Sequence, residues 1–155
     1  MDILLTNDDG IYAKGIKALA LELKAIGNLT IVAPDSERSS VSQAITLSRP
    51  LSYHKVYEAN NFVGYGVNGT PTDCVKLATD IILKKKPQLV VSGINYGPNE
   101  GCSVFYSGTV AGAREGALQG IPAIAVSLNA FDNPDFIKAA KVSAKFIKIF
   151  IKSKI

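Results

Sequence analysis

Residues 3–10 read Ile-Leu-Leu-Thr-Asn-Asp-Asp-Gly, a short apolar run that ends in two adjacent acids and a glycine. A continuous apolar run of this length, without alternation, predicts a strand that is buried on both faces. Such strands belong to parallel sheets, because helices cover both faces of those sheets. The stretch therefore predicts an α/β fold with two carboxylates at the carboxyl end of a strand, where ligands bind in open α/β sheets.

The rest of the chain repeats this alternation of apolar strands and amphipathic helices. The expected elements are strands at 29–33, 89–92 and 123–127, and helices at 14–26, 70–86, 109–118 and from 136 onward. Residues 45–67 alternate more loosely around two turn sequences, which predicts a β excursion at a sheet edge. We therefore predict an α/β three-layer sandwich with a mostly parallel sheet plus that excursion.

Turn and capping residues set the expected ends of these elements. Gly27 follows the first helix as a candidate left-handed cap, and Thr70 precedes Pro71 as an N-cap before a helical proline. Three lysines at 84–86 suit the negative end of that second helix. A glycine-rich loop is expected to follow the strand at 89–92, and His54 is expected on an exposed edge strand.

Composition limits the classes of protein that need to be considered. The chain has 155 residues, 47% hydrophobic, with a formal net charge of +4, which favours one folded domain and excludes disorder. No apolar run reaches the roughly 20 residues of a membrane span, and the start does not resemble a secretion signal, so a cytoplasmic protein is expected. Six lysines fall within residues 138–154, mostly as one helical stripe, which we interpret as a solvated face. Neither a nucleic-acid polymer nor a membrane is expected as a partner.

Polar residues follow the predicted strands at the same edge of the sheet. These loops are rich in oxygen and contain neither thiol nor imidazole: residues 7–10, 35–43, 93–99 and 106–109. Carboxylate, hydroxyl and amide oxygens suit a hard cation such as Mg²⁺ or Mn²⁺. Each residue also has a plainer interpretation, because Asp8-Asp9 could form a turn, Ser39 could bond its own backbone, and Asn95 could be a turn residue.

The sequence Ser107-Gly108-Thr109 begins a predicted helix. The first amides of a helix lack internal partners and lie at its positive end, so this start suits a phosphate group, although an ordinary N-cap would have the same sequence. A cation beside an anion-binding helix end suggests hydrolysis of a phosphate ester. Asp8 or Asp9 could take the proton from water, or the cation alone could suffice.

Five separate motifs in order along the chain resemble the SurE survival-protein family: residues 3–10, 33–42, 69–75, 91–99 and 106–110. The resemblance implies a Rossmann-like core and a metal-dependent 5′/3′-nucleotidase that hydrolyses nucleoside monophosphates and, in some members, short polyphosphate. It implies one divalent ion, Mg²⁺ or Mn²⁺ (with Ca²⁺ possible in a crystal), and a cytoplasmic homodimer or homotetramer. The implied metal ligands are Asp8, Asp9, Ser39 and Asn95, and the implied phosphate-binding residues are Asn99, Ser107, Gly108 and Thr109.

Two departures from the family pattern lead to further expectations. Ser40 stands where the family usually has glycine, so the second loop is expected to close less freely. Family members also continue beyond residue 155, so we expect a single domain over 1–155 without the C-terminal oligomerisation segment. The last helix is rich in apolar residues around 146–151, and we expect a second face of it to be covered by further chain or by another subunit.

Two other functions compete with this interpretation. One is a non-catalytic remnant that binds nucleotide or metal. The other is a phosphoacceptor signalling domain, which needs an aspartate after its third strand and a lysine after its fifth, whereas this chain has Ser92-Gly93 and Ser127-Leu128 at those places. The sequence at 64–69 matches a dinucleotide-binding glycine pattern, but it lies in an alternating strand and precedes Pro71, which argues against that site. Tyr96, Phe105 and Tyr106 could stack on a nucleobase or simply pack.

Overall fold

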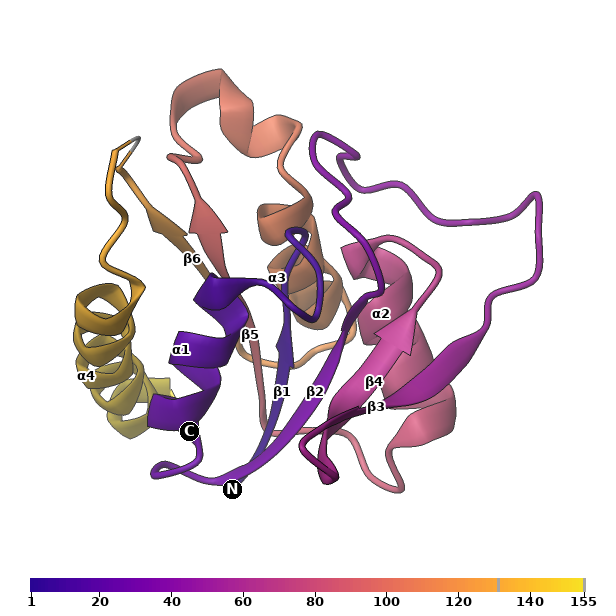
Figure 1. The fold of residues 1–155 in the computed structure, drawn as a ribbon, viewed down its shortest axis with the longest axis horizontal. Coiled ribbons are helices and arrows are strands. Elements are labelled where there is room, and N and C mark those ends of the chain that lie inside the picture. Colours follow the sequence, from indigo (N-terminus) through magenta and orange to yellow (C-terminus); the bar gives the residue numbers. More distant parts are fainter. Residues whose placement is uncertain (131, 155) are drawn as a thin grey trace.

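The computed structural model describes residues 1–130 and 132–154. Its six strands form one sheet in the order β3-β4-β2-β1-β5-β6 (Figure 1). The strands are β1 (Asp2–Thr6), β2 (Asn28–Pro34), β3 (Tyr53–Glu58), β4 (Asn61–Val67), β5 (Leu89–Tyr96) and β6 (Ala123–Leu128). The helices are α1 (Lys14–Leu23), α2 (Pro71–Leu77), α3 (Gly108–Leu118) and α4 (Phe136–Lys154), with a π-helical turn η1 (Ala78–Ile82) after α2 and a 3₁₀ turn η2 (Gly101–Phe105) before α3.

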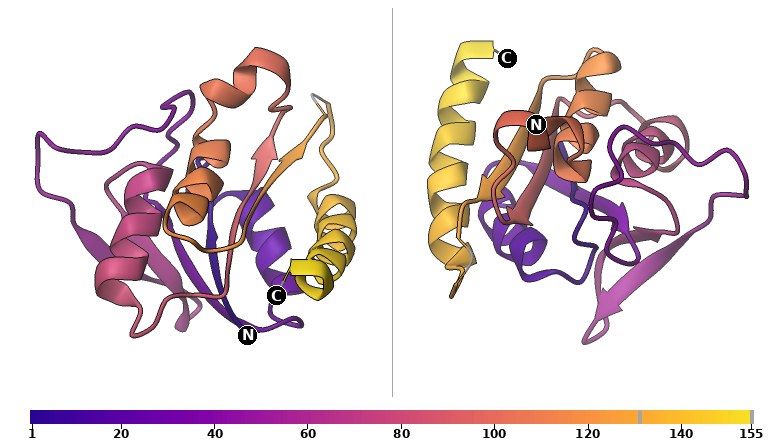
Figure 2. Two further views of the ribbon diagram at one scale, coloured as in Figure 1. Left: turned by 180° about the vertical axis from the view of Figure 1, so that it is seen from behind. Right: turned by 90° about the horizontal axis from the view of Figure 1, so that it is seen from above.

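The sheet is mostly parallel and is covered on both faces, as the sequence predicts. Among the strands that the structure describes, only β3 runs antiparallel to its neighbour. Helices α1 and α4 lie on one side and α2 and α3 on the other, which is clearest from above (Figure 2). The strand β1 alternates between the two cores, because Ile3 and Leu5 pack toward α1 while Leu4 packs toward α2, and all three are at most 1% exposed. Burial on both faces explains why this strand has a continuous apolar sequence.

The predicted β excursion is a hairpin at one edge of the sheet. Strands β3 and β4 pair antiparallel, and β4 also pairs in parallel with β2, so the hairpin extends the main sheet. Its glycine at 64 lies where a Cβ would approach the carbonyl oxygen of Ile31 to 2.6 Å, which accounts for that glycine by packing. His54 is exposed on the edge strand, as expected. Residues 45–52, at the start of the predicted excursion, form no strand.

Two predicted helix ends are wrong. The second helix ends at Ile82, so the lysines at 84–86 lie beyond it. The Thr79 hydroxyl donates to the carbonyl oxygens of Val75 and Lys76, and such bonds loosen the backbone ladder into a wider turn. Gly27 is not a left-handed cap. A Cβ there would lie 2.3 Å from the Met1 carbonyl oxygen, so close approach of two chain segments is the reason for that glycine.

The strand β5 is longer than predicted and brings Asn95 into the sheet. It continues from Leu89 through Tyr96, although glycine at 93 suggested a loop. Pairing with β6 shifts register between Ser92 and Asn95, which accommodates the irregular backbone at Gly93. Pairing beyond the irregularity, between Asn95 and Ser127, extends the strand past the expected end.

The helix α4 exposes an apolar stripe opposite its buried face. Val142, Phe146 and Ile149 are 60%, 58% and 66% exposed, whereas Ala144 and Ile147 pack into the core. The neighbouring lysines at 138, 141, 145, 148 and 152 are exposed, which confirms a solvated lysine face. What covers the apolar stripe stays a prediction. Within residues 1–130 and 132–154, no helix is long and apolar enough to cross a membrane.

The carboxylate of Asp73 ties the segment after β2 to the start of α2. It accepts hydrogen bonds from the Thr46 amide at 3.0 Å, the Thr46 hydroxyl at 2.6 Å and the Thr70 amide at 2.9 Å. Thr70 caps α2 in return by accepting from the Asp73 amide, as the sequence predicts. Asp73 is 2% exposed, whereas Thr46 and Thr70 are half-buried, so the carboxylate is the buried partner in these bonds.

Replacing Asp73 by alanine is expected to lower the free energy of unfolding by about 2–4 kcal/mol, because three donors lose a charged, buried acceptor. Denaturant unfolding of both proteins measures the difference. The matched control is Asp80→Ala, which removes an exposed carboxylate in η1 and should change the stability by less than about 0.5 kcal/mol. Equal effects of the two substitutions would contradict the role of Asp73 in holding this segment.

Candidate metal and phosphate site

A polar cavity of about 350 Å³ lies at the carboxyl edge of the sheet. It is formed by the loops after β1 and β2, the end of β5 and the segment that leads to α3. Its lining residues are Asp8, Asp9, Glu37, Ser39, Ser40, Asn95, Tyr96, Pro98, Asn99, Ser103, Tyr106 and Ser107. All four predicted metal ligands and two of the predicted phosphate-binding residues therefore share one cavity.

The turn after β1 is built to present Asp8 and Asp9. The Asn7 side chain donates to the Gly10 carbonyl oxygen at 3.0 Å, and Gly10 has a φ of +98°, which favours glycine. The Asp8 carbonyl oxygen accepts from the Arg38 amide at 2.7 Å, which joins this turn to the loop after β2. These bonds fix two loops that are distant in sequence side by side.

The start of α3 holds the carboxylate of Asp8. Asp8 is 4% exposed, and its Oδ1 accepts a short hydrogen bond from the Thr109 hydroxyl. A Cβ at Gly108 would lie 2.8 Å from the Asp8 Cβ, so a side chain there would push the two elements apart. Thr109 is fully buried and its hydroxyl points to Asp8, so its position favours orienting this acid over direct contact with phosphate.

The side chain of Asn95 presents its oxygen to the same place. Its amide nitrogen donates to the carbonyl oxygens of Tyr96 at 3.2 Å and Gly97 at 2.8 Å. The amide oxygen is left facing the Thr109 hydroxyl at 3.4 Å, beside the Asp8 carboxylate. Since an amide oxygen is a good ligand for a hard cation, this orientation fits the predicted role of Asn95.

The two aspartates are more basic than ordinary carboxylates. Burial raises the pKa of Asp9 to about 6, and the charges of Asp8 and Glu37 add to the rise. Burial also raises the pKa of Asp8, although hydrogen bonds from Thr109 oppose it. In the described part of the chain, no lysine or arginine forms an ion pair with these acids. Clustered, desolvated carboxylates without a cationic side chain favour binding of a metal cation.

Glu37 is a third acid in the cavity, and the sequence reasoning did not select it. The Ser39 hydroxyl donates to Glu37 Oε1 at 2.5 Å, which leaves the lone pairs of that hydroxyl available to a cation. Glu37 lies within the polar loop 35–43, but sequence alone does not show which side chains of a loop turn inward. Across residues 1–130 and 132–154, no three His, Cys, Asp or Glu side chains form a metal-binding group. A metal site here would therefore need neutral oxygens such as those of Ser39 and Asn95.

The loop after β2 has a strained backbone beside the cavity. Ser40 has a φ of +57° and Ser42 a φ of +54°, in the left-handed region that favours glycine. Ser42 also donates its amide to the Tyr106 carbonyl oxygen at 2.9 Å and its hydroxyl to that of Phe105 at 2.8 Å. These bonds hold the loop against the segment before α3. Ser39 and Ser40 line the cavity, so the loop lies at the site although position 40 is serine.

Two of the four predicted phosphate-binding residues, Asn99 and Ser107, line the cavity. Ser107 is the N-cap of α3, and its hydroxyl accepts from the Val110 amide at 3.1 Å. The side-chain nitrogen of Asn99 donates to the Ser127 hydroxyl at 2.8 Å, which holds this side chain in place. Gly108 and Thr109 do not line the cavity. The side chains of Asn99 and Ser107 are therefore the ones that an anion in the cavity would meet.

Comparison with known proteins gives a consistent result. Residues 3–155 match the family model described as "Survival protein SurE". The chain is 54% identical over 146 residues to the 5'-nucleotidase SurE of Chlorobium phaeobacteroides, covering 94% of this chain and 57% of that protein. It is 50% identical over 150 residues to the 5'-nucleotidase SurE of Thermosipho melanesiensis, covering 97% and 59%.

A solved structure shows the same fold. The crystal structure of the SurE protein from Aquifex aeolicus matches with a TM-score of 0.92 and 44% sequence identity, over 100% of this chain and 62% of that one. The chain thus spans less than three fifths of the length of the two sequence relatives above.

Replacing Asp9 by asparagine is expected to raise the melting temperature of the metal-free protein near pH 7.5. The folded-state pKa of about 6 lies above the ordinary value of 3.8, so ionised Asp9 destabilises the folded state. This penalty is complete above about pH 6 and disappears as the pH falls toward about 4. The gain in melting temperature should therefore shrink over that range.

Thermal melts in chelator between about pH 4 and 8 measure this effect. The control, Asp80→Asn, changes an exposed acid outside the cavity and should show no such pH profile. A gain for Asp9→Asn that is independent of pH would mean that ionised Asp9 does not destabilise the fold.

Proposed function

This chain belongs to the SurE survival-protein family, and we propose that it hydrolyses nucleoside 5′/3′-monophosphates to nucleoside and phosphate with the help of one divalent cation. The observation that carries the proposal is the polar cavity in which Asp8, Asp9 and Asn95 converge beside the start of α3. Acids whose pKa values are raised, next to a helix start, suit a cation and a phosphate in contact.

The proposed cation ligands are Asp8, Asp9, Ser39 and Asn95, and the cation is Mg²⁺ or Mn²⁺ because every one of these donors is oxygen. When bound, such an ion stabilises negative charge on phosphoryl oxygens and makes nearby water more acidic. Asp8 is held in place by Thr109, and Asn95 by its bonds to the backbone. The ligand set would therefore be largely arranged before the ion binds.

Asp8 and Asp9 are the candidates for accepting a proton from the attacking water. Asp8 is 4% exposed and its Oδ1 is engaged by Thr109. Asp9 is half-buried and lines the cavity, and its Oδ2 accepts a hydrogen bond from the Tyr96 amide at 3.2 Å. The greater access of Asp9 favours it over Asp8 as the proton acceptor.

The phosphate group is proposed to lie against Asn99 and Ser107, with the Gly108 backbone behind them. Gly108 keeps the start of α3 close to Asp8. A phosphate group at this helix start would therefore lie next to the carboxylates. Thr109 is proposed to act through Asp8 as a positioning residue.

Aromatic side chains at the cavity offer a place for the nucleobase. Tyr106 lines the cavity and is 64% exposed, and the adjacent Phe105 is 67% exposed. Exposed rings beside a phosphate site suit base stacking, which does not require a particular base. Tyr96 also lines the cavity, but its ring packs near that of Phe136, with centroids 6.4 Å apart. We therefore propose Tyr106, with Phe105, as the stacking surface.

Phosphate release from nucleoside monophosphates tests the proposed reaction. The chain is expected to turn over substrate with Mn²⁺ or Mg²⁺ and to stop in chelator. Asp9→Asn should lower the rate at least about 100-fold, because a ligand and a proton acceptor are lost together. Asp80→Asn, outside the cavity, should retain full activity. Turnover that persists in chelator would contradict the metal requirement, and cation binding without turnover would favour the non-catalytic alternative.

Tyr106→Ala is expected to raise KM for nucleoside monophosphates about tenfold, because base stacking contributes about 1–3 kcal/mol. The KM for glycerol phosphate, which has no base, should stay unchanged. Tyr57→Ala removes a ring of similar exposure from the distant hairpin and serves as the control. An equal rise in KM for both substrates would show that Tyr106 does not act on the base.

A further inference from the structure

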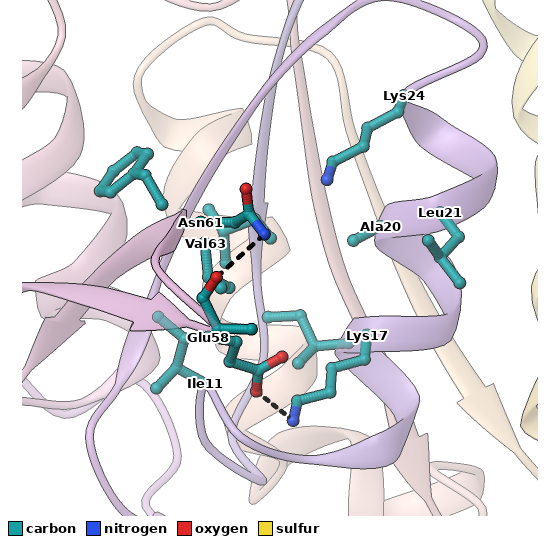
Figure 3. A pocket seen from close by; sticks show the side chains of 12 residues that line it. Ile11, Lys17, Ala20, Leu21, Lys24, Glu58, Asn61 and Val63 are labelled. Atoms are coloured by element: carbon teal, nitrogen blue, oxygen red, sulfur yellow. Dashed lines mark hydrogen bonds and ion pairs between the residues drawn. The ribbon is translucent and has the colours of Figure 1, made fainter.

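A second cavity of about 480 Å³ lies between α1 and the β3–β4 hairpin (Figure 3). It shares no lining residue with the polar cavity. Its apolar wall is formed by Ile11, Ile16, Ala20, Ile31, Phe62 and Val63. The first four of these side chains are at most 6% exposed and belong to the hydrophobic core, whereas Phe62 is 47% exposed.

The cavity follows from the sheet order. Helix α1 packs on β1, β2 and β5. The hairpin extends the same sheet beyond β2, on the side away from β5. The side chains of α1 therefore face the hairpin across a gap whose floor is Ile31 on β2 and Val63 on β4. Figure 3 shows helix and hairpin as the two walls, with the Ala20 side chain directed into the space between them.

The charged side chains that line this cavity are two lysines and one glutamate, so one positive charge has no negative partner among them. Lys17 pairs with Glu58 at 2.5 Å across its opening. Lys24 lines the cavity and has no ion-pair partner among the residues that the structure describes. In Figure 3 the Lys24 amine extends from the end of α1 toward the hairpin and Asn61. An occupant therefore meets apolar side chains on its body and an unpaired ammonium group at one end.

We propose that this cavity binds a small organic anion with an aliphatic or aromatic body, whose anionic group pairs with Lys24. The volume lies within the range of roughly 300–1,000 Å³ that is usual for small-molecule sites, and an apolar lining with few polar groups is typical of them. The single uncompensated charge selects an anion over a neutral or cationic ligand. The site is separate from the polar cavity and does not depend on the proposed phosphatase activity.

Calorimetric titration of the full chain with octanoate and with 1-octanol tests the proposal, because these probes share a body and differ in charge. Octanoate is expected to bind saturably and more tightly than octanol. Lys24→Gln should weaken octanoate binding about two- to fivefold, within the range of an exposed ion pair, and leave octanol binding unchanged. Lys55→Gln makes the same change on the hairpin outside the cavity, and should have no effect.

A second variant tests the position of the apolar body. Ala20→Leu places a larger side chain into the cavity and should abolish binding of both probes, with a melting temperature at least equal to that of the unsubstituted chain. Equal octanoate affinity of the unsubstituted chain and Lys24→Gln would overturn the proposal, as would the absence of saturable binding. A chain that self-associates through this face, so that Ala20→Leu releases monomers in sedimentation, would also overturn it in favour of a second copy.

Discussion

The contact between Thr109 and Asp8 is the interaction on which the rest of the site depends. It joins the start of α3 to the end of β1, two elements that are about a hundred residues apart in the chain. Gly108 permits the approach because a Cβ there would collide with Asp8. With Asp8 fixed, the Asn95 oxygen and the Asp9 carboxylate lie around the same space, and the Arg38 amide brings the loop of Ser39 against it. The cavity is thus assembled around one held carboxylate.

Electrostatics make this arrangement of acids unfavourable at neutral pH. Asp8 and Asp9 have raised pKa values because they are desolvated, and Glu37 adds a like charge. Such a cluster destabilises a fold at neutral pH, so the surrounding structure must compensate. This cost can be offset by the burial of β1 and β5 on both faces and by the hydrogen bonds to the Asp73 carboxylate. The second cavity differs in kind, because its wall is apolar and its unpaired charge is positive.

Several features were predictable because they depend on short stretches of chain. The buried strand β1, the capped start of α2 at Thr70 and the exposed edge position of His54 all follow from local pattern. Two of the errors arise where a contact between separate segments overrides that pattern. Asn95 stays within β5 because β6 pairs beyond the irregular backbone at Gly93. Gly27 lies where the Met1 backbone approaches closely, and the sequence rules for helix ends do not include such a contact.

The sequence by itself determined the layered α/β fold and the placement of Asp8 and Asp9 after a buried strand, since the pattern of apolar residues reflects burial. It also determined which loops meet at the carboxyl edge, because parallel strands all end there. Only the tertiary structure decided that Glu37 turns into the polar cavity, that Thr109 turns toward Asp8, and that a gap opens between α1 and the hairpin. These features depend on how loops and layers pack in three dimensions, and side-chain direction in a loop has no sequence period that would reveal it.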